Sequence, residues 1–146
     1  MRGYFEIGIY NPKSEVNIGT LWRSAYILGA SGIFTIGRRY REQASDTLKA
    51  TRHIPLRHFL EFDDFFETMP KGARLIGIEE CGKELHSWCH PHQAVYLLGA
   101  EDYGLPQKVQ DKCHSIVSIE NVRDFCYNVA TAGSIVMYDR LIRGTY

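Results

Sequence analysis

Short apolar runs alternate along the chain with stretches of helical periodicity, and this alternation constrains the fold most strongly. Runs typical of strands occupy residues 4–10, 33–36, 75–78, 94–98 and 115–119. Spacing and composition predict helices over residues 17–28, 42–51, 56–69 and 128–142. Strands that are separated by helices pair in parallel. The sequence therefore predicts an α/β fold in which a parallel sheet carries helices on both faces.

Length and charge narrow the class of protein. The 146 residues fit a single domain over residues 1–146. Seventeen Lys and Arg residues balance seventeen Asp and Glu residues, which excludes a histone-like protein that binds by bulk charge. The amino terminus lacks a signal-peptide pattern, and no run approaches the ~20 apolar residues of a membrane helix. The four cysteines form no C-x-x-C pair, so we expect free thiols, a cytoplasmic location and no membrane contact.

In open parallel sheets, ligands bind outside the carboxyl ends of the strands. This rule directs attention to the loops after residues 10, 36, 78, 98 and 119. The first candidate segment there runs from Asn17 to Arg23. We expect Asn17 to cap a helix and Arg23 to stack one turn above Gly19, where backbone amides at the helix N-terminus favour a phosphate or ribose. The alternative is an ordinary capped helix with a solvated arginine.

The second segment, residues 99–105, follows a buried strand and places two glycines around Glu101. Such a loop lets the backbone approach a ligand closely, although a plain turn is the alternative. It is not a Walker A loop, because no Lys-Ser/Thr follows Gly104. The chain also lacks G-x-G-x-x-G, which argues against nicotinamide or flavin binding.

The third segment, Cys126-Tyr127-Asn128-Val129, opens the last predicted helix. Asn128 is either only the cap of this helix or also part of a site. Cys126 is either a small buried hydrophobe or a catalytic thiol, and the sequence identifies no His base for the second role.

Together the three segments resemble the SpoU-type (TrmH-like) branch of the SPOUT RNA methyltransferases. Asn17 and Arg23 match an Asn and an Arg that this family places six residues apart near the amino terminus. Residues 99–105 match its Gly-x-Glu-x-x-Gly-Leu motif, and residues 126–129 match its Ser-Leu-Asn-Val motif. The resemblance spans residues 9–139 in the family's order and spacing.

The resemblance implies a SPOUT-type parallel α/β fold with a carboxy-terminal trefoil knot, a homodimer, and methyl transfer from S-adenosylmethionine to a ribose 2′-hydroxyl of RNA. It favours transfer RNA over ribosomal RNA, because the chain has little room for an extra RNA-binding domain. Arg23 would be the catalytic residue, and Asn17, Glu101 and Asn128 would order the site around it. The residues implied to bind the cofactor are Leu98, Gly99, Ala100, Gly104, Ile119 and Cys126.

The chain departs from the family pattern at three places. Cys126 stands for a Ser, Tyr127 stands for a Leu, and Ile-Glu-Asn at 119–121 stands for Ile-Pro-Met. These departures motivate an alternative hypothesis, a non-catalytic RNA-binding or dimeric scaffold that retains the fold. A small-molecule methyltransferase on the same fold is a third hypothesis.

A basic stretch supplies the local positive charge that RNA binding needs. Residues 38–58 hold six Lys or Arg residues but only two acidic ones, and the alternative is a solvated surface. We expect RNA contacts from Arg38, Arg39, Tyr40, Arg41 and Arg52, with the aromatic ring able to stack on a base. The spacing of His86, Cys89, His90 and His92 matches no zinc-finger pattern, so no metal is expected.

Overall fold

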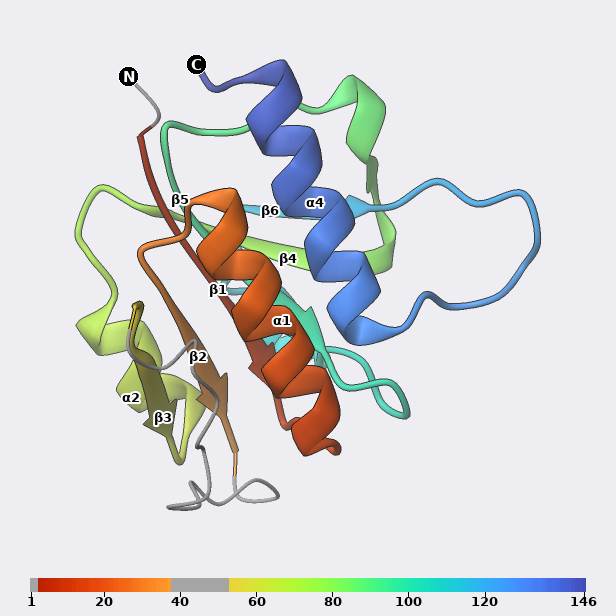
Figure 1. Cartoon of the computed structure of the whole chain (residues 1–146). Helices are drawn as coiled ribbons and strands as arrows, with labels where there is room; N and C mark the ends of the chain where they lie inside the picture. The colour runs from red at the N-terminus through yellow and green to blue at the C-terminus, as the bar shows by residue number, and fades with distance from the viewer. Residues whose placement is uncertain (1–2, 38–52) are drawn as a thin grey trace.

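The computed structural model describes residues 3–37 and 53–146 of the chain. Its strands span Tyr4–Tyr10 (β1), Gly32–Ile36 (β2), Leu56–Phe59 (β3), Arg74–Glu84 (β4), Gln93–Gly99 (β5) and Ser115–Ser118 (β6). They form one sheet in the order β3-β2-β1-β5-β4-β6, and every neighbouring pair is parallel (Figure 1). The predicted parallel α/β class is confirmed.

Helices cover both faces of this sheet. They span Glu15–Leu28 (α1), Phe62–Thr68 (α2), Gln107–Gln110 (α3) and Val129–Arg143 (α4), and a short 3-10 helix covers Leu85–Ser87 (η2). α1 and α4 lie side by side on one face, whereas α2 and α3 contribute buried residues to the core of the other (Figure 1). Within the described ranges, no helix is long and apolar enough to cross a membrane.

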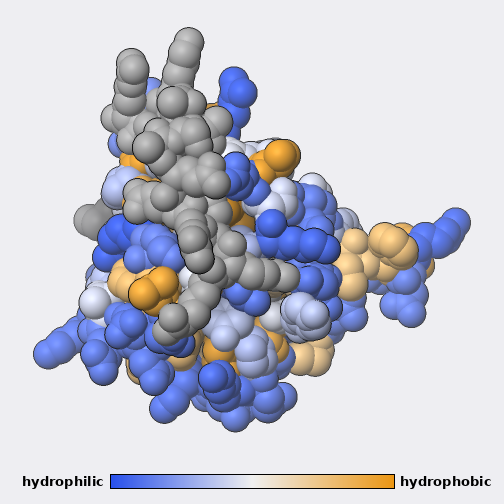
Figure 2. Space-filling model, turned by 90° about the horizontal axis from the view of Figure 1, so that it is seen from below, coloured by the Kyte–Doolittle hydropathy of each residue, from blue (hydrophilic) through white to orange (hydrophobic). Residues whose placement is uncertain are grey.

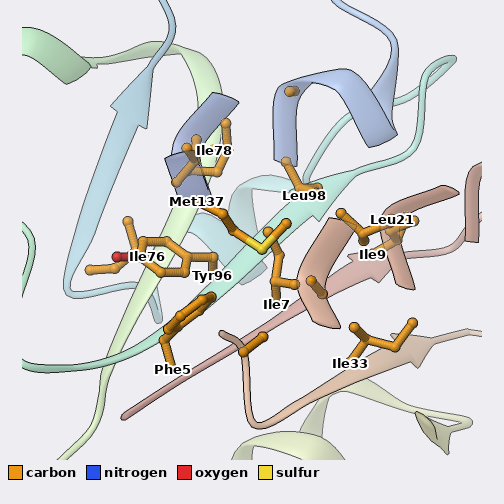
Figure 3. Packing of buried hydrophobic residues seen from close by; sticks show 14 of the residues in the cluster. Phe5, Ile7, Ile9, Leu21, Ile33, Ile76, Ile78, Tyr96, Leu98 and Met137 are labelled. Atoms are coloured by element: carbon orange, nitrogen blue, oxygen red, sulfur yellow. The ribbon is translucent and has the colours of Figure 1, made fainter. Parts of the chain in front are cut away.

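The larger core lies between the sheet and the α1–α4 pair. Ile7 and Leu98, from the neighbouring strands β1 and β5, pack there with Leu21 of α1 and Met137 of α4 (Figure 3). Gly133 lets the two helices approach closely, because a Cβ at this position would lie 2.5 Å from Leu21 Cδ1. The start of α4 is thereby held against α1 and over the carboxyl end of the sheet.

The first helix begins earlier than predicted. Ser14 caps α1 by accepting a hydrogen bond from Asn17 N at 3.4 Å, so Asn17 lies in the first turn and is not the cap. Arg23 therefore lies well inside α1 and not beside its N-terminus, where free backbone amides would attract anions. The cap predicted for the last helix is confirmed, since Asn128 Oδ1 accepts from Thr131 N at 3.1 Å.

The predicted helix over residues 56–69 is wrong in its first part, which forms β3. Arg57 of this strand makes two hydrogen bonds, at 2.8 and 2.9 Å, to the buried carboxylate of Glu6 on β1. A buried carboxylate requires such a partner, and this long-range pairing outweighs the local helical spacing. The other predicted strands are confirmed, and β4 extends further than predicted, to Glu84. The predicted helix over residues 42–51 lies outside the described residues.

β1 and β5 lie side by side at the centre of the sheet, with Tyr10 opposite Gly99. The chain extends the sheet away from β1 through β2 and β3, and away from β5 through β4 and β6. Such a switch point opens a crevice at the carboxyl ends of the strands, which is where ligands bind in open α/β sheets. The loops that follow β1 and β5 meet at this crevice.

Candidate active site at the carboxyl edge of the sheet

Three side chains from distant parts of the sequence meet at this crevice. Asn17, in the first turn of α1, donates from Nδ2 to Glu101 Oε1 at 2.9 Å. Asn128, at the start of α4, donates from Nδ2 to both Asn17 Oδ1 and Glu101 Oε1, each at 2.9 Å. We call these residues the Asn–Glu–Asn cluster. Glu101 and Asn128 are exposed and Asn17 is half-buried, so the cluster is open to solvent on one side.

Asn128 is both a helix cap and a member of this cluster. Its Oδ1 accepts from Thr131 N and so satisfies the first turn of α4, which leaves its Nδ2 group to reach the other two residues. A carboxylate has only acceptors, and the two amide side chains supply the donors that Glu101 needs. The cluster thus joins α1, the loop after β5 and α4 through side chains alone.

The loop after β5 folds back on itself and depends on its two glycines. Ala100 pairs with Gly104 as an antiparallel bridge, closed by a hydrogen bond from Gly104 N to Ala100 O at 2.8 Å. Gly104 has a φ of +64°, which side chains rarely adopt. At Gly99 a Cβ would lie 2.4 Å from the backbone carbon of Gly104. The strand-to-loop turn therefore requires glycine at both positions.

A pocket of about 290 Å³ opens beside the cluster. Its walls are the loop after β5, the middle of β4, the start of α4 and the segment between β6 and α4. Its apolar side chains include Ile78, Leu98, Ile119, Val129 and Ala132. All six residues that the resemblance implied for cofactor binding line this pocket. Figure 2 views the molecule from the side of the strands' carboxyl ends, where hydrophilic residues prevail and the segment after β6 projects to the right, as in Figure 1.

Two adjacent carboxylates in the middle of β4, directly after the stretch that pairs with β5, fix the far wall of the pocket. Glu79 Oε1 accepts a hydrogen bond from Leu105 N and so ties β4 to the loop after β5. Burial raises the pKa of Glu79, although this backbone hydrogen bond acts in the opposite direction. Glu80 Oε1 accepts a hydrogen bond from Cys126 Sγ at 2.8 Å.

Cys126 is exposed, so the hypothesis of a small buried hydrophobe is wrong. Its hydrogen bond to Glu80 raises the pKa of the thiol, and the neighbouring carboxylates act in the same direction. A raised pKa keeps the thiol protonated at neutral pH, which disfavours a nucleophilic role. Cys126 therefore closes the pocket as a neutral hydrogen-bond donor.

Arg23 is not part of the Asn–Glu–Asn cluster. It is exposed on α1 and makes no hydrogen bond or ion pair with any other described residue. The residues predicted for RNA contact, namely Arg38, Arg39, Tyr40, Arg41 and Arg52, lie outside the described residues. The structure thus brings together three of the four residues predicted for catalysis.

His90, one of the histidines considered as zinc ligands, makes hydrogen bonds within the core instead. His90 is buried, with Nδ1 2.7 Å from Tyr96 Oη and Nε2 2.7 Å from Asp139 Oδ2. Arg140 of α4 donates to Tyr96 Oη at 3.1 Å and to the carbonyl oxygen of Pro91 at 2.7 Å. We call His90, Tyr96, Asp139 and Arg140 the buried polar network. Across residues 3–37 and 53–146, no cluster of His, Cys, Asp or Glu could hold a metal ion.

Glu79 and Glu80 are the site residues that sequence reasoning missed. They follow directly after Ile78, the last residue that β4 pairs with β5, and so stand at the carboxyl edge where ligands were expected. The rule that selected the loop after residue 78 could have found them. They were overlooked because they belong to none of the three motifs.

Comparison with known proteins identifies the family. The model of the SpoU rRNA methylase family matches residues 4–138. An uncharacterized tRNA/rRNA methyltransferase of Archaeoglobus fulgidus is 26% identical over 142 residues, which cover 93% of this chain and 63% of the relative.

Solved structures share the fold. The SpoU methyltransferase AviRb from Streptomyces viridochromogenes, in complex with AdoMet, matches with a TM-score of 0.88 at 20% identity, over 98% of this chain and 58% of that one. An AdoMet-bound rRNA methyltransferase from Sinorhizobium meliloti matches with a TM-score of 0.84 at 22% identity, over 98% and 57%. A structure that concerns the 2-OH methylation of C/U34 on tRNA matches with a TM-score of 0.85 at 23% identity, over 98% and 99%.

The chain spans less than two thirds of the length of the A. fulgidus relative and of AviRb, but nearly all of the tRNA-related structure. The structural likeness, at these identities, concerns the fold. The family model, by contrast, covers almost the whole sequence and includes all three motifs that meet at the crevice. On that match, the chain belongs to the SpoU rRNA methylase family.

Proposed function

We propose that this protein is an S-adenosylmethionine-dependent RNA 2′-O-ribose methyltransferase. The observation that carries the proposal is the Asn–Glu–Asn cluster, in which residues from three separate motifs are hydrogen-bonded beside a pocket at the switch point of the sheet. The AdoMet complexes of AviRb and of the S. meliloti relative support the same cofactor here.

The pocket suits S-adenosylmethionine in its chemistry. Leu98 and Ile119 supply apolar surface for a planar ring, and Gly99 and Ala100 leave backbone groups within reach of a polar ligand. Gly104 adopts a positive φ at little cost, and this conformation shapes the loop beside the pocket. We propose that these residues, with Cys126, hold the cofactor.

The cofactor supplies the reactive methyl group, so the protein has to bind the ribose, align its hydroxyl and stabilise charge. We propose that Arg23 holds the ribose or its phosphate and stabilises the negative charge that develops on the hydroxyl oxygen. Its guanidinium stays protonated at neutral pH, which disfavours a role as general base. Asn17, Glu101 and Asn128 would hold α1, the loop after β5 and α4 in fixed positions relative to one another.

We propose a homodimer that forms through the exposed face of α1 and α4. Large apolar side chains on these two adjacent helices are open to solvent, and they are Val16, Tyr26, Ile27, Tyr138, Leu141 and Ile142. Apolar surface of this kind on a protein commonly marks an interface with another protein. The burial of this surface against a second copy would remove it from water.

Arg23 shares one face of α1 with two of these exposed residues. It lies four residues before Ile27 and seven after Val16, and such positions project in the same direction from a helix. If this face is the dimer interface, Arg23 points toward the partner subunit and away from its own cluster. We therefore propose that Arg23 acts in the site of the partner subunit.

Mixing two inactive variants tests this arrangement. Arg23→Ala and Glu101→Ala should each lack methyl transfer. An equimolar mixture that has exchanged subunits should regain about a quarter of wild-type activity, because half of its dimers are mixed and one of the two composite sites in each mixed dimer carries both native residues. No recovery in dimers shown to have mixed would mean that Arg23 serves its own subunit.

We further propose that the substrate is transfer RNA and that the chain around β6 and α4 forms a trefoil knot. The match to the structure concerned with tRNA, over 99% of its length, supports this substrate. We propose that Arg38, Arg39, Tyr40, Arg41 and Arg52 contact the RNA.

Two measurements test the proposed function. Calorimetric titration should detect S-adenosylmethionine binding, and no binding up to millimolar cofactor would favour the non-catalytic scaffold. Incubation with labelled cofactor and total cellular RNA should label the transfer-RNA fraction. Methyl transfer that proceeds equally with and without RNA would favour a small-molecule methyltransferase.

A further inference from the structure

The pocket is strongly acidic. Four carboxylate side chains line it, and none of the described residues that line it is a Lys or an Arg. They are Glu79, Glu80, Glu101 and Asp102. The proposed function uses only Glu101. The two glutamates of β4 lie outside the three motifs on which the resemblance rests, so their presence calls for a separate explanation.

Both glutamates are fixed in place, and neither makes an ion pair with a described Lys, Arg or His residue. Glu79 is half-buried and holds the backbone of Leu105, whereas Glu80 is exposed and accepts from the neutral thiol of Cys126. Backbone N–H and thiol donors satisfy an acceptor atom but do not cancel its charge. The negative charge of Glu79 and Glu80 therefore acts on whatever occupies the pocket.

We infer that Glu79 and Glu80 make this pocket selective for the positively charged cofactor over its uncharged product. The inference rests on the proposed function. S-adenosylmethionine carries a sulfonium, an ammonium and a carboxylate, and so has one net positive charge. Methyl transfer forms a bond from carbon to the hydroxyl oxygen, breaks the bond from sulfur to the methyl carbon and releases the hydroxyl proton to water. The sulfur is left as a neutral thioether, and S-adenosylhomocysteine has no net charge.

The selectivity follows from the lining of the pocket. Four residues with carboxylate side chains and no described Lys or Arg line a space of about 290 Å³, so a ligand bound there has acidic side chains around it and no basic ones. The attraction to the sulfonium ends when the methyl group leaves, so the acidic lining favours binding of the cofactor and release of the product. Apolar contacts to the adenosine are the same for both ligands and contribute nothing to this difference.

Calorimetric titration of the full chain with three ligands tests the inference. S-adenosylmethionine should bind roughly tenfold more tightly than S-adenosylhomocysteine, on the basis of about threefold for each partly solvated charge pair. Sinefungin, in which an amine replaces the methylsulfonium, should behave like the charged cofactor. An increase in salt from 0.05 to 0.5 M should weaken the two charged ligands severalfold and leave the uncharged one unchanged.

Glu80→Gln is the informative variant, because an amide oxygen can still accept from Cys126. It should bind S-adenosylmethionine about threefold more weakly and S-adenosylhomocysteine as the wild type does. Glu67→Gln is the matched control, since it removes the same charge from the exposed side of α2, away from the pocket. It should change neither affinity.

The outcomes separate this inference from the function on which it rests. Equal affinity of the wild type for all three ligands, without a difference in salt dependence, would overturn the charge selectivity and leave the methyltransferase proposal intact. An equal change for charged and uncharged ligands in Glu80→Gln would also overturn it, because that result indicates a change of shape. Failure of all three ligands to bind would overturn the proposed function and this inference with it.

Discussion

The two ends of α4 carry hydrogen-bonded clusters of opposite character. At its carboxyl half, Arg140 is only 4% exposed and His90 only 1%, and their polar atoms bond to neighbouring carbonyl, hydroxyl and carboxylate groups. At its amino end, Asn128 and Glu101 are exposed and border a pocket. Both clusters join α4 to other parts of the chain, but only the second leaves polar atoms within reach of a ligand.

This difference indicates that the buried polar network serves stability and that the Asn–Glu–Asn cluster serves function. Desolvated polar groups have to be satisfied inside the protein, so the buried polar network holds α4 in place and has no capacity left for a ligand. The Asn–Glu–Asn cluster is solvated, contributes less to stability and can bind. Changes in the first cluster should therefore lower stability, whereas changes near the second should lower activity.

The largest loss of stability should come from Arg140→Met. This change keeps much of the side-chain volume but leaves the carbonyl group of Pro91 without its donor and removes one of the two donors to the carbonyl group of His92, and we expect a loss of about 3 kcal/mol in the free energy of unfolding. Urea unfolding measures this loss. Methyl transfer by the folded fraction should stay normal, and a variant as stable as the wild type would remove the distinction between the two clusters.

Arg23→Lys should lower activity and leave stability unchanged. The exposed side chain can change without loss of stability, but a lysine lacks the planar fork, and we expect transfer to fall by about 100-fold. The ratio kcat/KM with transfer RNA measures the effect, and the urea midpoint serves as the control. Near-normal turnover would exclude any role that needs the guanidinium.

Asn128→Ser should produce a smaller effect, which separates the two roles of this residue. A serine still caps α4, so the loss of stability should stay within a few tenths of a kcal/mol. It cannot donate to Asn17 and Glu101 as the amide does, and we expect transfer to fall about tenfold. If stability and activity fell together, the residue would be only a cap.

The smallest effect should be a dependence of stability on pH. Burial lowers the pKa of His90 below its ordinary value of 6.5, although the hydrogen bond to Asp139 opposes this shift. As the pH falls through 6.5, His90 therefore takes up a proton in the unfolded chain while it is still neutral in the folded protein. Proton uptake stabilises the unfolded chain, so the free energy of unfolding decreases below that pH. Urea midpoints between pH 7.5 and 5.5 should decrease, with a shallower slope in His90→Gln. Equal slopes would mean that His90 does not titrate on unfolding.

Much of the fold could be predicted from the sequence because its strands are short, apolar and separated. Residues 94–98 and 128–142 carry unambiguous patterns, and both became the elements that were expected. Residues 56–59 did not, because the partner of Arg57 is Glu6, more than fifty positions away. Local periodicity contains no information about such a pair.

The candidate site was predictable to the extent that it lies in motifs. Asn17, Glu101 and Asn128 were selected from three segments, and the parallel order of the strands explains why these segments meet. The acidic wall was not predicted, because the sequence pattern of two adjacent glutamates is the same in a pocket wall as on a solvated surface. Nor could the sequence show that Arg23 stands apart from the cluster.

The position of the transferred methyl group tests the central claim most directly. RNA labelled by this protein from S-adenosylmethionine can be digested with alkali, which cleaves only next to a free 2′-hydroxyl. We predict that the label appears in alkali-resistant dinucleotides and that Arg23→Lys reduces it about 100-fold. Label that appears in mononucleotides, as base methylation would give, would contradict the assignment of ribose 2′-O transfer to this site.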